Sequence, residues 1–243
     1  MTAEPSTDTS AASDKKLSTT IRQWFVESPT SIGGSARRRR WEVVQRNFPE
    51  LPDMRVVDLG GTVETWRRAP VRPREVTVVN LFEPGDSDDP RLIPVKGDAC
   101  TARDTLVSAA CATEFDLAFS NSLIEHVGGH ARRLALSREI RSLAPYHWVQ
   151  TPYRYFPIEP HWLFPLMQFL PMYLRANVAL RWPLSHSKPN SWEDAREDVV
   201  WTELVSQTEM RMYFPESVLF KERLAGLVKS ITAIRAPGCG STS

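Results

Sequence analysis

Apolar runs and amphipathic stretches alternate through most of the chain. The longest apolar runs have the length and β-branched content of buried strands, with 92–95 the weakest of them. They occupy residues 54–59, 76–80, 92–95, 115–119 and 146–151. Helical periodicity predicts helices over 37–48, 103–112 and 131–143, and a short one over 21–26. In the first of these, Trp41, Val44 and Phe48 fall at i, i+3 and i+7 on one face.

The last part of the chain predicts two more strands, 210–214 and 229–234, with a helix over 216–227 between them. Strands that alternate with helices at this spacing imply a mainly parallel sheet. The predicted fold class is therefore α/β, Rossmann-like and doubly wound. It has a seven-stranded sheet, helices on both faces, and an apolar insertion after the fifth strand.

Residues 153–208 interrupt this alternation. Their segment 160–174 is aromatic and apolar, but His161, Pro165, Gln168 and Pro171 break it too often for a membrane span. We expect this insertion to be a lid or cap over the cleft. The predicted organisation is a disordered tail at 1–17, one domain over 18–236, and a loose end at 237–243.

Composition narrows the class of protein. The 243 residues carry a formal net charge of +1, which gives no general attraction to nucleic acid or to an anionic membrane. Three cysteines without metal-ligand spacing favour a reduced, cytoplasmic protein. The polar N-terminus lacks the apolar core of a signal peptide. The sequence does not indicate an oligomeric state.

Four short motifs follow the predicted strands in order. They are Asp58-Leu59-Gly60-Gly61, then Asn80, then Gly97-Asp98-Ala99, and finally the stretch 115–127, which contains Ser120-Asn121-Ser122. Their order and spacing resemble the class I S-adenosylmethionine (SAM)-dependent methyltransferases. Segments 151–165 and 213–235 resemble a bacterial, small-molecule (type 11-like) branch of that family. The resemblance covers roughly residues 54–235 and implies SAM as the cofactor.

The resemblance implies a role for each motif at the first two strands. Gly60 and Gly61 let the backbone approach the carboxypropyl amine end of the cofactor, and Asp58 anchors that loop or attracts the ammonium group. A plain turn of two glycines is the alternative. Asn80 stands where the family has an acid that binds both ribose hydroxyls, and it can bond one of them.

The later motifs complete the implied cofactor site. Asp98 would accept the adenine amino group and the amide of Ala99 would meet a ring nitrogen; the alternative is that Asp98 only caps the next helix. Asn121 or Ser122 would face the sulfonium region. His126 lies about one turn beyond Ser122 and is either a site residue or a packing histidine.

Two departures from the family pattern also bear on other cofactors. The chain has Gly60-Gly61-Thr62 where the family commonly has three glycines. A nicotinamide site needs G-x-G-x-x-G and an acid after the second strand, and the chain has neither, so a dehydrogenase is disfavoured.

Methyl transfer to a weakly acidic acceptor needs alignment and a base. The first candidate for this base is His161 and the second is Glu159. His126 and His147 are further candidates. The alternative is structural: Glu159 would pair with an arginine such as Arg154, and His161 would pack beside Trp162. The histidines have no spacing typical of a metal site.

The first hypothesis is a SAM-dependent methyltransferase acting on a small-molecule or lipid-like acceptor, with oxygen as the expected atom. The aromatic insertion favours an apolar acceptor, although ordinary core packing would explain it too. The second hypothesis is a non-catalytic protein of the same fold that binds a metabolite or partner. A third is RNA methylation through the run Arg37–Arg40, which is more typical of a solvated face.

Overall fold

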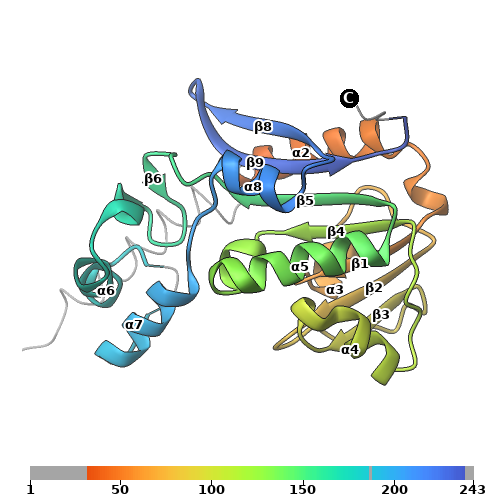
Figure 1. Ribbon diagram of the computed structural model, residues 1–243, viewed down its shortest axis with the longest axis horizontal. Coiled ribbons are helices and arrows are strands. Elements are labelled where there is room, and N and C mark those ends of the chain that lie inside the picture. The colour runs from red at the N-terminus through yellow and green to blue at the C-terminus, as the bar shows by residue number, and fades with distance from the viewer. Residues whose placement is uncertain (1–31, 186–187, 239–243) are drawn as a thin grey trace, which may run out of the picture. The chain divides into compact units, whose positions relative to one another are not determined.

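The computed structural model describes residues 32–185 and 188–238 of the chain (Figure 1). The helix predicted at 21–26 and the tail at 1–17 lie outside the described residues. The strands are β1 Arg55–Leu59, β2 Glu75–Asn80, β3 Leu92–Lys96, β4 Leu117–Asn121, β5 Tyr146–Pro152, β6 Ile158–Glu159, β7 Phe164–Pro165, β8 Val218–Leu224 and β9 Leu227–Arg235. The α-helices are α2 Ile32–Asn47, α3 Val63–Arg67, α4 Ala102–Ser108, α5 Gly129–Leu143, α6 Met172–Arg181, α7 Trp192–Trp201 and α8 Gln207–Tyr213. Short 3₁₀ helices are η2 Leu51–Asp53, η3 Ala99–Thr101, η4 Ile124–His126 and η5 Met167–Phe169.

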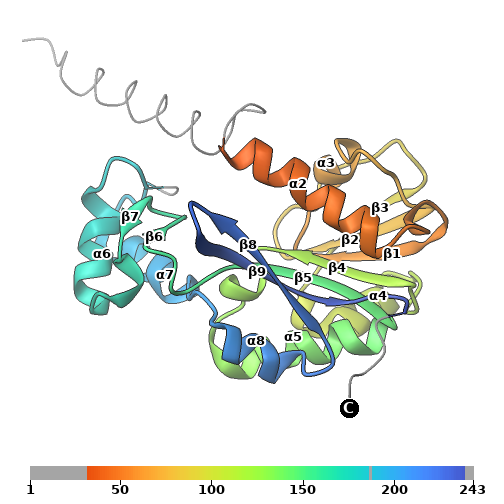
Figure 2. The same ribbon diagram turned by 90° about the horizontal axis from the view of Figure 1, so that it is seen from above.

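Seven strands form one sheet in the order β3-β2-β1-β4-β5-β9-β8. Neighbours from β3 to β5 are parallel, and β9 runs antiparallel to both β5 and β8. Figure 2 shows α3 on one face of this sheet and α4, α5 and α8 on the other. The predicted α/β class and mainly parallel seven-stranded sheet are confirmed.

The chain divides into two compact units. The larger holds the sheet and consists of Val43–Pro157 and the described residues from Val199 onward. The smaller consists of residues 32–42 and Ile158–Asp198, and it contains the two-stranded β6–β7 sheet and α6. The part of this unit at Ile158–Asp198 falls within the insertion predicted at 153–208.

The predictions for the end of the chain were partly wrong. Residues 210–214 belong to helix α8, because Ser206 and Glu209 form a capping box that starts a helix at Gln207. Residues 218–224 are strand β8 rather than a helix. Ala225 and Gly226, at φ +49° and +83°, make a two-residue hairpin turn that joins β8 to β9.

The strands around β1 supply the core of the larger unit. Every residue of β1 after Arg55 is buried, as are the four inner residues of β2. Trp66 packs edge-on against Phe119, and Phe119 stacks on Trp148, at centroid distances of 5.1 and 6.2 Å. These rings hold α3, β4 and β5 together directly beneath the ends of the strands.

Candidate functional site

The carboxyl ends of β1 and β4 lie side by side at the switch point of the sheet. The chain proceeds outward from β1 to β2 and β3, then returns to β4 on the other side of β1. Ligands of open α/β sheets bind at such a point. The buried Ser120 hydroxyl donates to the Leu59 carbonyl at 2.9 Å and ties the two strand ends together.

Asp58 is a fully buried acid at the end of β1. Its Oδ2 accepts a hydrogen bond from Trp66 Nε1 at 2.7 Å. Within the described residues, its buried Oδ1 has no hydrogen-bond partner. Burial raises the pKa of Asp58 to about 7, although the bond from Trp66 acts in the opposite direction. The site therefore contains a buried oxygen atom that can accept a donor.

The two glycines after β1 are each required by a neighbouring side chain. Gly60 has φ +85°, and a Cβ there would lie 2.7 Å from Leu123 Cδ1. A Cβ on Gly61 would lie 1.8 Å from Asp58 Oδ2. Leu123 and the Asp58 carboxylate therefore occupy the space that side chains would fill. Their predicted approach to a cofactor stays a prediction, with a packing reason beside it.

Asn80, at the end of β2, fastens this glycine loop. Its Nδ2 donates to the carbonyls of Gly61 at 2.8 Å and Gly60 at 3.2 Å. Its Oδ1 accepts from the amide of Phe82 at 3.0 Å. Both amide hydrogens are engaged, so only Oδ1, with its second lone pair, can bind a further group. A carboxylate here would face two carbonyl oxygens, which explains why an amide occupies the position.

Asp98 combines a capping role with an ion pair. Its Oδ1 accepts from Cys100 N at 2.9 Å and caps η3, whose first residue is the buried Ala99. Its Oδ2 accepts from Arg132 Nη2 on α5 at 2.6 Å. Burial acts to raise the pKa of Asp98, but these bonds outweigh it and lower the pKa. The capping alternative therefore holds, and the adenine role stays a prediction.

Asn121 ends β4, Ser122 follows it directly, and both side chains contact β5. Asn121 Oδ1 accepts from Trp148 Nε1 at 3.0 Å, and Ser122 Oγ lies 3.3 Å from Gln150 Oε1. Ser122 has φ +53°, an uncommon conformation for a residue other than glycine. This bend directs the chain from β4 into η4 at the switch point.

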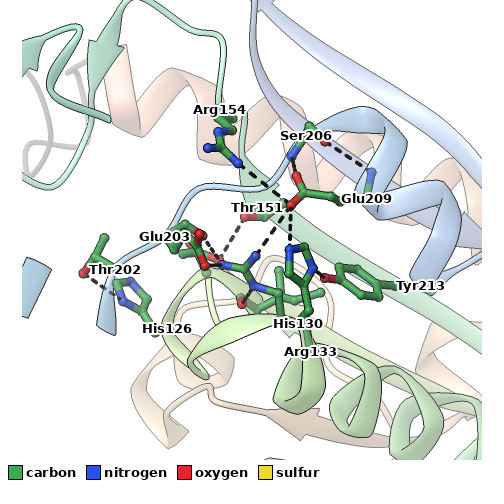
Figure 3. A network of polar contacts seen from close by, with 12 residues as sticks. His126, His130, Arg133, Thr151, Arg154, Thr202, Glu203, Ser206, Glu209 and Tyr213 are labelled. Atoms are coloured by element: carbon green, nitrogen blue, oxygen red, sulfur yellow. Dashed lines mark hydrogen bonds and ion pairs between the residues drawn. The ribbon is translucent and has the colours of Figure 1, made fainter. Parts of the chain in front are cut away.

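His126 ends η4 and lies beside a network of polar contacts (Figure 3). Its Nδ1 is 3.5 Å from Thr202 Oγ1. The neighbouring Glu125 is fully buried and accepts from the hydroxyl of Thr151 at 2.9 Å. His126 is thus half-buried among structural contacts, and its role as a site residue stays a prediction.

Arg133 is the centre of this network. Its guanidinium is fully buried and donates to Glu203 through Nη2, to the carbonyl at 2.6 Å and to Oε2 at 3.0 Å. Nη1 lies 3.8 Å from Glu209 Oε1, which also lies 3.9 Å from Arg154. Burial acts to raise the pKa of Glu209, but Ser206 and the two arginines lower it. Arg154 therefore pairs with Glu209, and the predicted alternative of an Arg154 pair with Glu159, which belongs to the other unit, stays a prediction.

Backbone contacts beside this network join the two ends of the insertion within the larger unit. Tyr153 bridges Val205, and the amide of Arg154 donates to the Val205 carbonyl at 3.1 Å. The amide of Glu203 donates to the Glu125 carbonyl at 2.9 Å. The chain therefore leaves and re-enters the larger unit at one fixed place.

Glu159 and His161 form a pair inside the smaller unit. Glu159 is buried; its Oε2 accepts from the amides of His161 and Trp162 at 2.7 and 2.9 Å. Its Oε1 is 2.6 Å from His161 Nδ1. The ring centroids of His161 and Trp162 are 5.9 Å apart, so His161 packs beside Trp162, as one of the alternatives predicted. The pair also has the geometry in which a carboxylate orients an imidazole and leaves base chemistry to Nε2.

His147 lies at the opposite end of the sheet. It is the second residue of β5 and pairs with Arg235, the last residue of β9. Burial lowers the pKa of His147 to about 4, and Arg235 and Arg141 add to this shift. Its Nε2 contacts Ser217 Oγ at 2.6 Å. A base is needed at the carboxyl ends of the strands, so His147 is a packing residue.

Several residues that hold the site in place were not predicted from the sequence. Trp66 and Arg132 hold the two acids, and Leu123 packs over Gly60. Trp66 lies eight positions after Asp58, one helix later, and no local pattern links the two. Arg133 stands among the basic residues of α5, and its complete burial was not predicted.

No protein-family model matches the chain, and no curated protein sequence matches it. Many solved structures match its fold. The CurJ carbon methyltransferase has 13% identity and a TM-score of 0.53 over 92% of this chain and 59% of that one. The 1,6-didemethyltoxoflavin-N1-methyltransferase of Burkholderia thailandensis, with bound S-adenosylhomocysteine, has 13% identity and a TM-score of 0.49 over 97% and 93%. Magnesium protoporphyrin IX methyltransferase of Synechocystis PCC 6803 has 10% identity and a TM-score of 0.48 over 93% and 95%.

Proposed function

From the fold of the class I SAM-dependent methyltransferases, which this chain has, we propose that the protein transfers a methyl group from SAM. The acceptor is a small molecule or a lipid-like compound, and oxygen is the acceptor atom. The proposal rests on the sheet order and on the polar residues at the ends of β1, β2 and β4.

The single observation that carries the proposal is the buried Oδ1 of Asp58. An acceptor atom without a partner is costly in a protein interior unless a ligand supplies a donor. The ammonium group of the methionine part of SAM is such a donor, and it would also favour the charged form of the carboxyl. Asp58 thus fits the group that the fold implies.

The other site residues would hold the rest of the cofactor. Asn80 offers the second lone pair of Oδ1 to one ribose hydroxyl. Asp98 and the amide of Ala99 would take the adenine edge, and Asn121 and Ser122 border the reacting end. When bound, SAM supplies an electrophilic methyl group on a sulfonium sulfur.

Glu159 and His161 are proposed to handle the proton of the acceptor. The contact with Glu159 Oε1 holds the proton of neutral His161 on Nδ1. Nε2 is then the basic nitrogen, and it would take the proton of an acceptor hydroxyl while Glu159 stabilises the resulting imidazolium.

Isothermal titration of the purified protein with SAM and with S-adenosylhomocysteine tests the proposal. Micromolar binding of both ligands is expected. Gly60→Arg should abolish it, because an arginine at φ +85° would displace Leu123 from the glycine loop. Circular dichroism of the variant controls for loss of the fold. Absence of binding by the parent protein at millimolar ligand would refute the proposal.

A non-catalytic role is the second candidate, and one observation favours it. Both hydrogens of the Asn80 amide are engaged by the glycine loop, so this position lacks the charged grip on ribose that the family has. A protein that binds a metabolite without methylating it would bind SAM weakly and show no turnover. Release of S-adenosylhomocysteine with a panel of hydroxylated acceptors separates the two candidates.

A further inference from the structure

The smaller unit exposes an unusual concentration of large apolar side chains. Five of nine consecutive residues are about half exposed or more; they are Leu166, Phe169, Met172, Tyr173 and Leu174. The first two flank or end η5, and the other three form the first turn of α6. Apolar patches of this density mark interaction sites in soluble proteins.

The arrangement of these residues favours a fluid apolar phase over a rigid partner. Met172, Tyr173 and Leu174 are consecutive in a helix, so their side chains point about 100° apart and cover more than half of its circumference. A groove in a partner protein receives one face of a helix. A lipid phase surrounds an inserted turn from all sides.

The charges within the patch segment fit an anionic surface. Residues 160–192 contain no aspartate or glutamate, although the chain has 29 acids in 243 residues; the acids that follow, Glu193, Asp194, Glu197 and Asp198, lie on α7. The cations in this stretch are Arg175, Arg181 and Lys188. Basic residues beside inserted apolar and aromatic residues are typical of segments that lie in the membrane interface.

A hollow next to the patch combines the same two properties. It has a volume of about 380 Å³ and is lined by Leu170, Leu174, Val178 and Trp182, with Asn177 and Arg181 as its polar residues. Its apolar lining suits a hydrocarbon chain, and the exposed Arg181 suits an acidic headgroup. No helix in the described part of the chain is long and apolar enough to cross a membrane.

We propose that residues 165–182 bind the surface of an anionic lipid bilayer. The first turn of α6 and Phe169 would enter the boundary between headgroups and acyl chains. Arg181 would lie at the level of the phosphates. Tyr173, whose ring is 5.1 Å from that of Trp192, would occupy the interfacial level that aromatic residues favour.

Co-sedimentation of the full chain with vesicles tests this proposal without any cofactor. Phosphatidylcholine vesicles are compared with vesicles that contain 30% phosphatidylglycerol. We expect binding to the anionic vesicles that weakens as salt is added. Because the assay involves no methyl transfer, its failure would leave the proposed enzymatic function standing.

Two methionines provide a matched pair of variants. Met172→Ser removes an apolar side chain from the patch, and Met212→Ser removes one of similar exposure, 53% against 58%, from α8 in the larger unit. We expect Met172→Ser to weaken vesicle binding by about tenfold and Met212→Ser to leave it unchanged. Phe169→Ser is a second patch variant in case Met172→Ser fails to fold. Thermal melting verifies the fold of each variant.

Charge substitutions test the second part of the proposal. Arg181→Gln should weaken binding to anionic vesicles by about fivefold, while Lys221→Gln, an exposed change on β8, should not. The proposal is overturned if the parent chain stays in the supernatant at millimolar lipid, or if Met172→Ser and Met212→Ser bind alike. It is also overturned if sedimentation equilibrium shows a dimer that Met172→Ser disrupts and vesicles do not compete, because the patch would then join two copies of the chain.

Discussion

Replacing Asp58 by asparagine should stabilise the protein and weaken its binding of SAM. Burial raises the pKa of this carboxyl from 3.8 to about 7. The native state therefore holds the proton more tightly than the unfolded state does. Stability from this group is fully present below pH 3.8 and is lost as the pH rises to about 7.

The size of the effect follows from the shift. At about 1.4 kcal/mol per pKa unit, the shift corresponds to about 4 kcal/mol of stability lost by pH 7. Asparagine has nearly the same shape and does not titrate. Its amide nitrogen would stand where Oδ1 has no partner, at a cost of about 1–3 kcal/mol. The expected net gain in the free energy of unfolding is about 1–3 kcal/mol at pH 7.

Urea unfolding without cofactor, repeated from pH 5 to pH 8, measures this prediction. The parent should lose stability across this range, and Asp58→Asn should lose much less. Asp53→Asn, an exposed change just before β1, is the control and should stay within about 0.5 kcal/mol of the parent. A variant that is less stable than the parent at pH 7, with the same pH dependence, would refute the assigned burial cost.

Binding of SAM should change in the opposite direction. Loss of a charge-assisted bond to the ammonium group predicts a dissociation constant about 10–100 times larger. In the parent, binding should weaken about tenfold per pH unit below pH 7, because the carboxyl must lose its proton to bind a cation. Unchanged affinity in Asp58→Asn would remove Asp58 from the cofactor site, whatever its effect on stability.

Three further changes test neighbouring contacts. Asn80→Asp places a carboxylate against the carbonyls of the glycine loop and should lower the free energy of unfolding, measured in urea at pH 7, by about 2 kcal/mol. Equal stability of variant and parent would contradict a stabilising role of the bonds from Asn80 to Gly60 and Gly61. Gly60 and Gly226 both have φ near +84°, but only a Cβ at Gly60 would meet a side chain, that of Leu123. Gly60→Ala should therefore lower the free energy of unfolding by about 1–3 kcal/mol more than Gly226→Ala in the same assay. Equal losses would exclude the Leu123 contact. Glu159→Gln should move the proton of His161 from Nδ1 to Nε2, as seen in ¹⁵N shifts of the imidazole, and an unchanged tautomer would mean that Glu159 does not orient the ring.

The parallel part of the sheet was predictable because its signals are local. Each strand from β1 to β5 is a short apolar run that ends at a polar or glycine residue, and most predicted bounds lie within two residues of the observed ones. Helix α4 is shorter than predicted: it ends at Ser108, and Ala110 adopts φ +54°. The β8–β9 hairpin was missed because its turn, Ala225-Gly226, lacks the Asn-Gly or Asp-Gly pair that usually marks one.

The positions of the site residues were predictable, but their partners were not. The order of strands places Asp58, Asn80 and Asn121 at one edge of the sheet, and a sequence pattern can indicate that. The bonds from Trp66 to Asp58 and from Arg132 to Asp98 join residues of different elements. Such contacts depend on side-chain directions in the folded chain, which no local spacing specifies.

One departure from the family pattern, Asn80, is tied to the glycine loop in the structure. The carboxylate of Asp58 lies against Cα of Gly61, and the carbonyl of Gly61 accepts a hydrogen bond from the side-chain amide of Asn80. The side-chain oxygen of Asn80 in turn accepts from the backbone amide of Phe82. The first glycine turn is thereby fixed by side chains from both strands, and an acid at position 80 would break this chain of contacts. If the loop holds its shape through Asn80, then restoring the acid alone should lower both stability and SAM affinity.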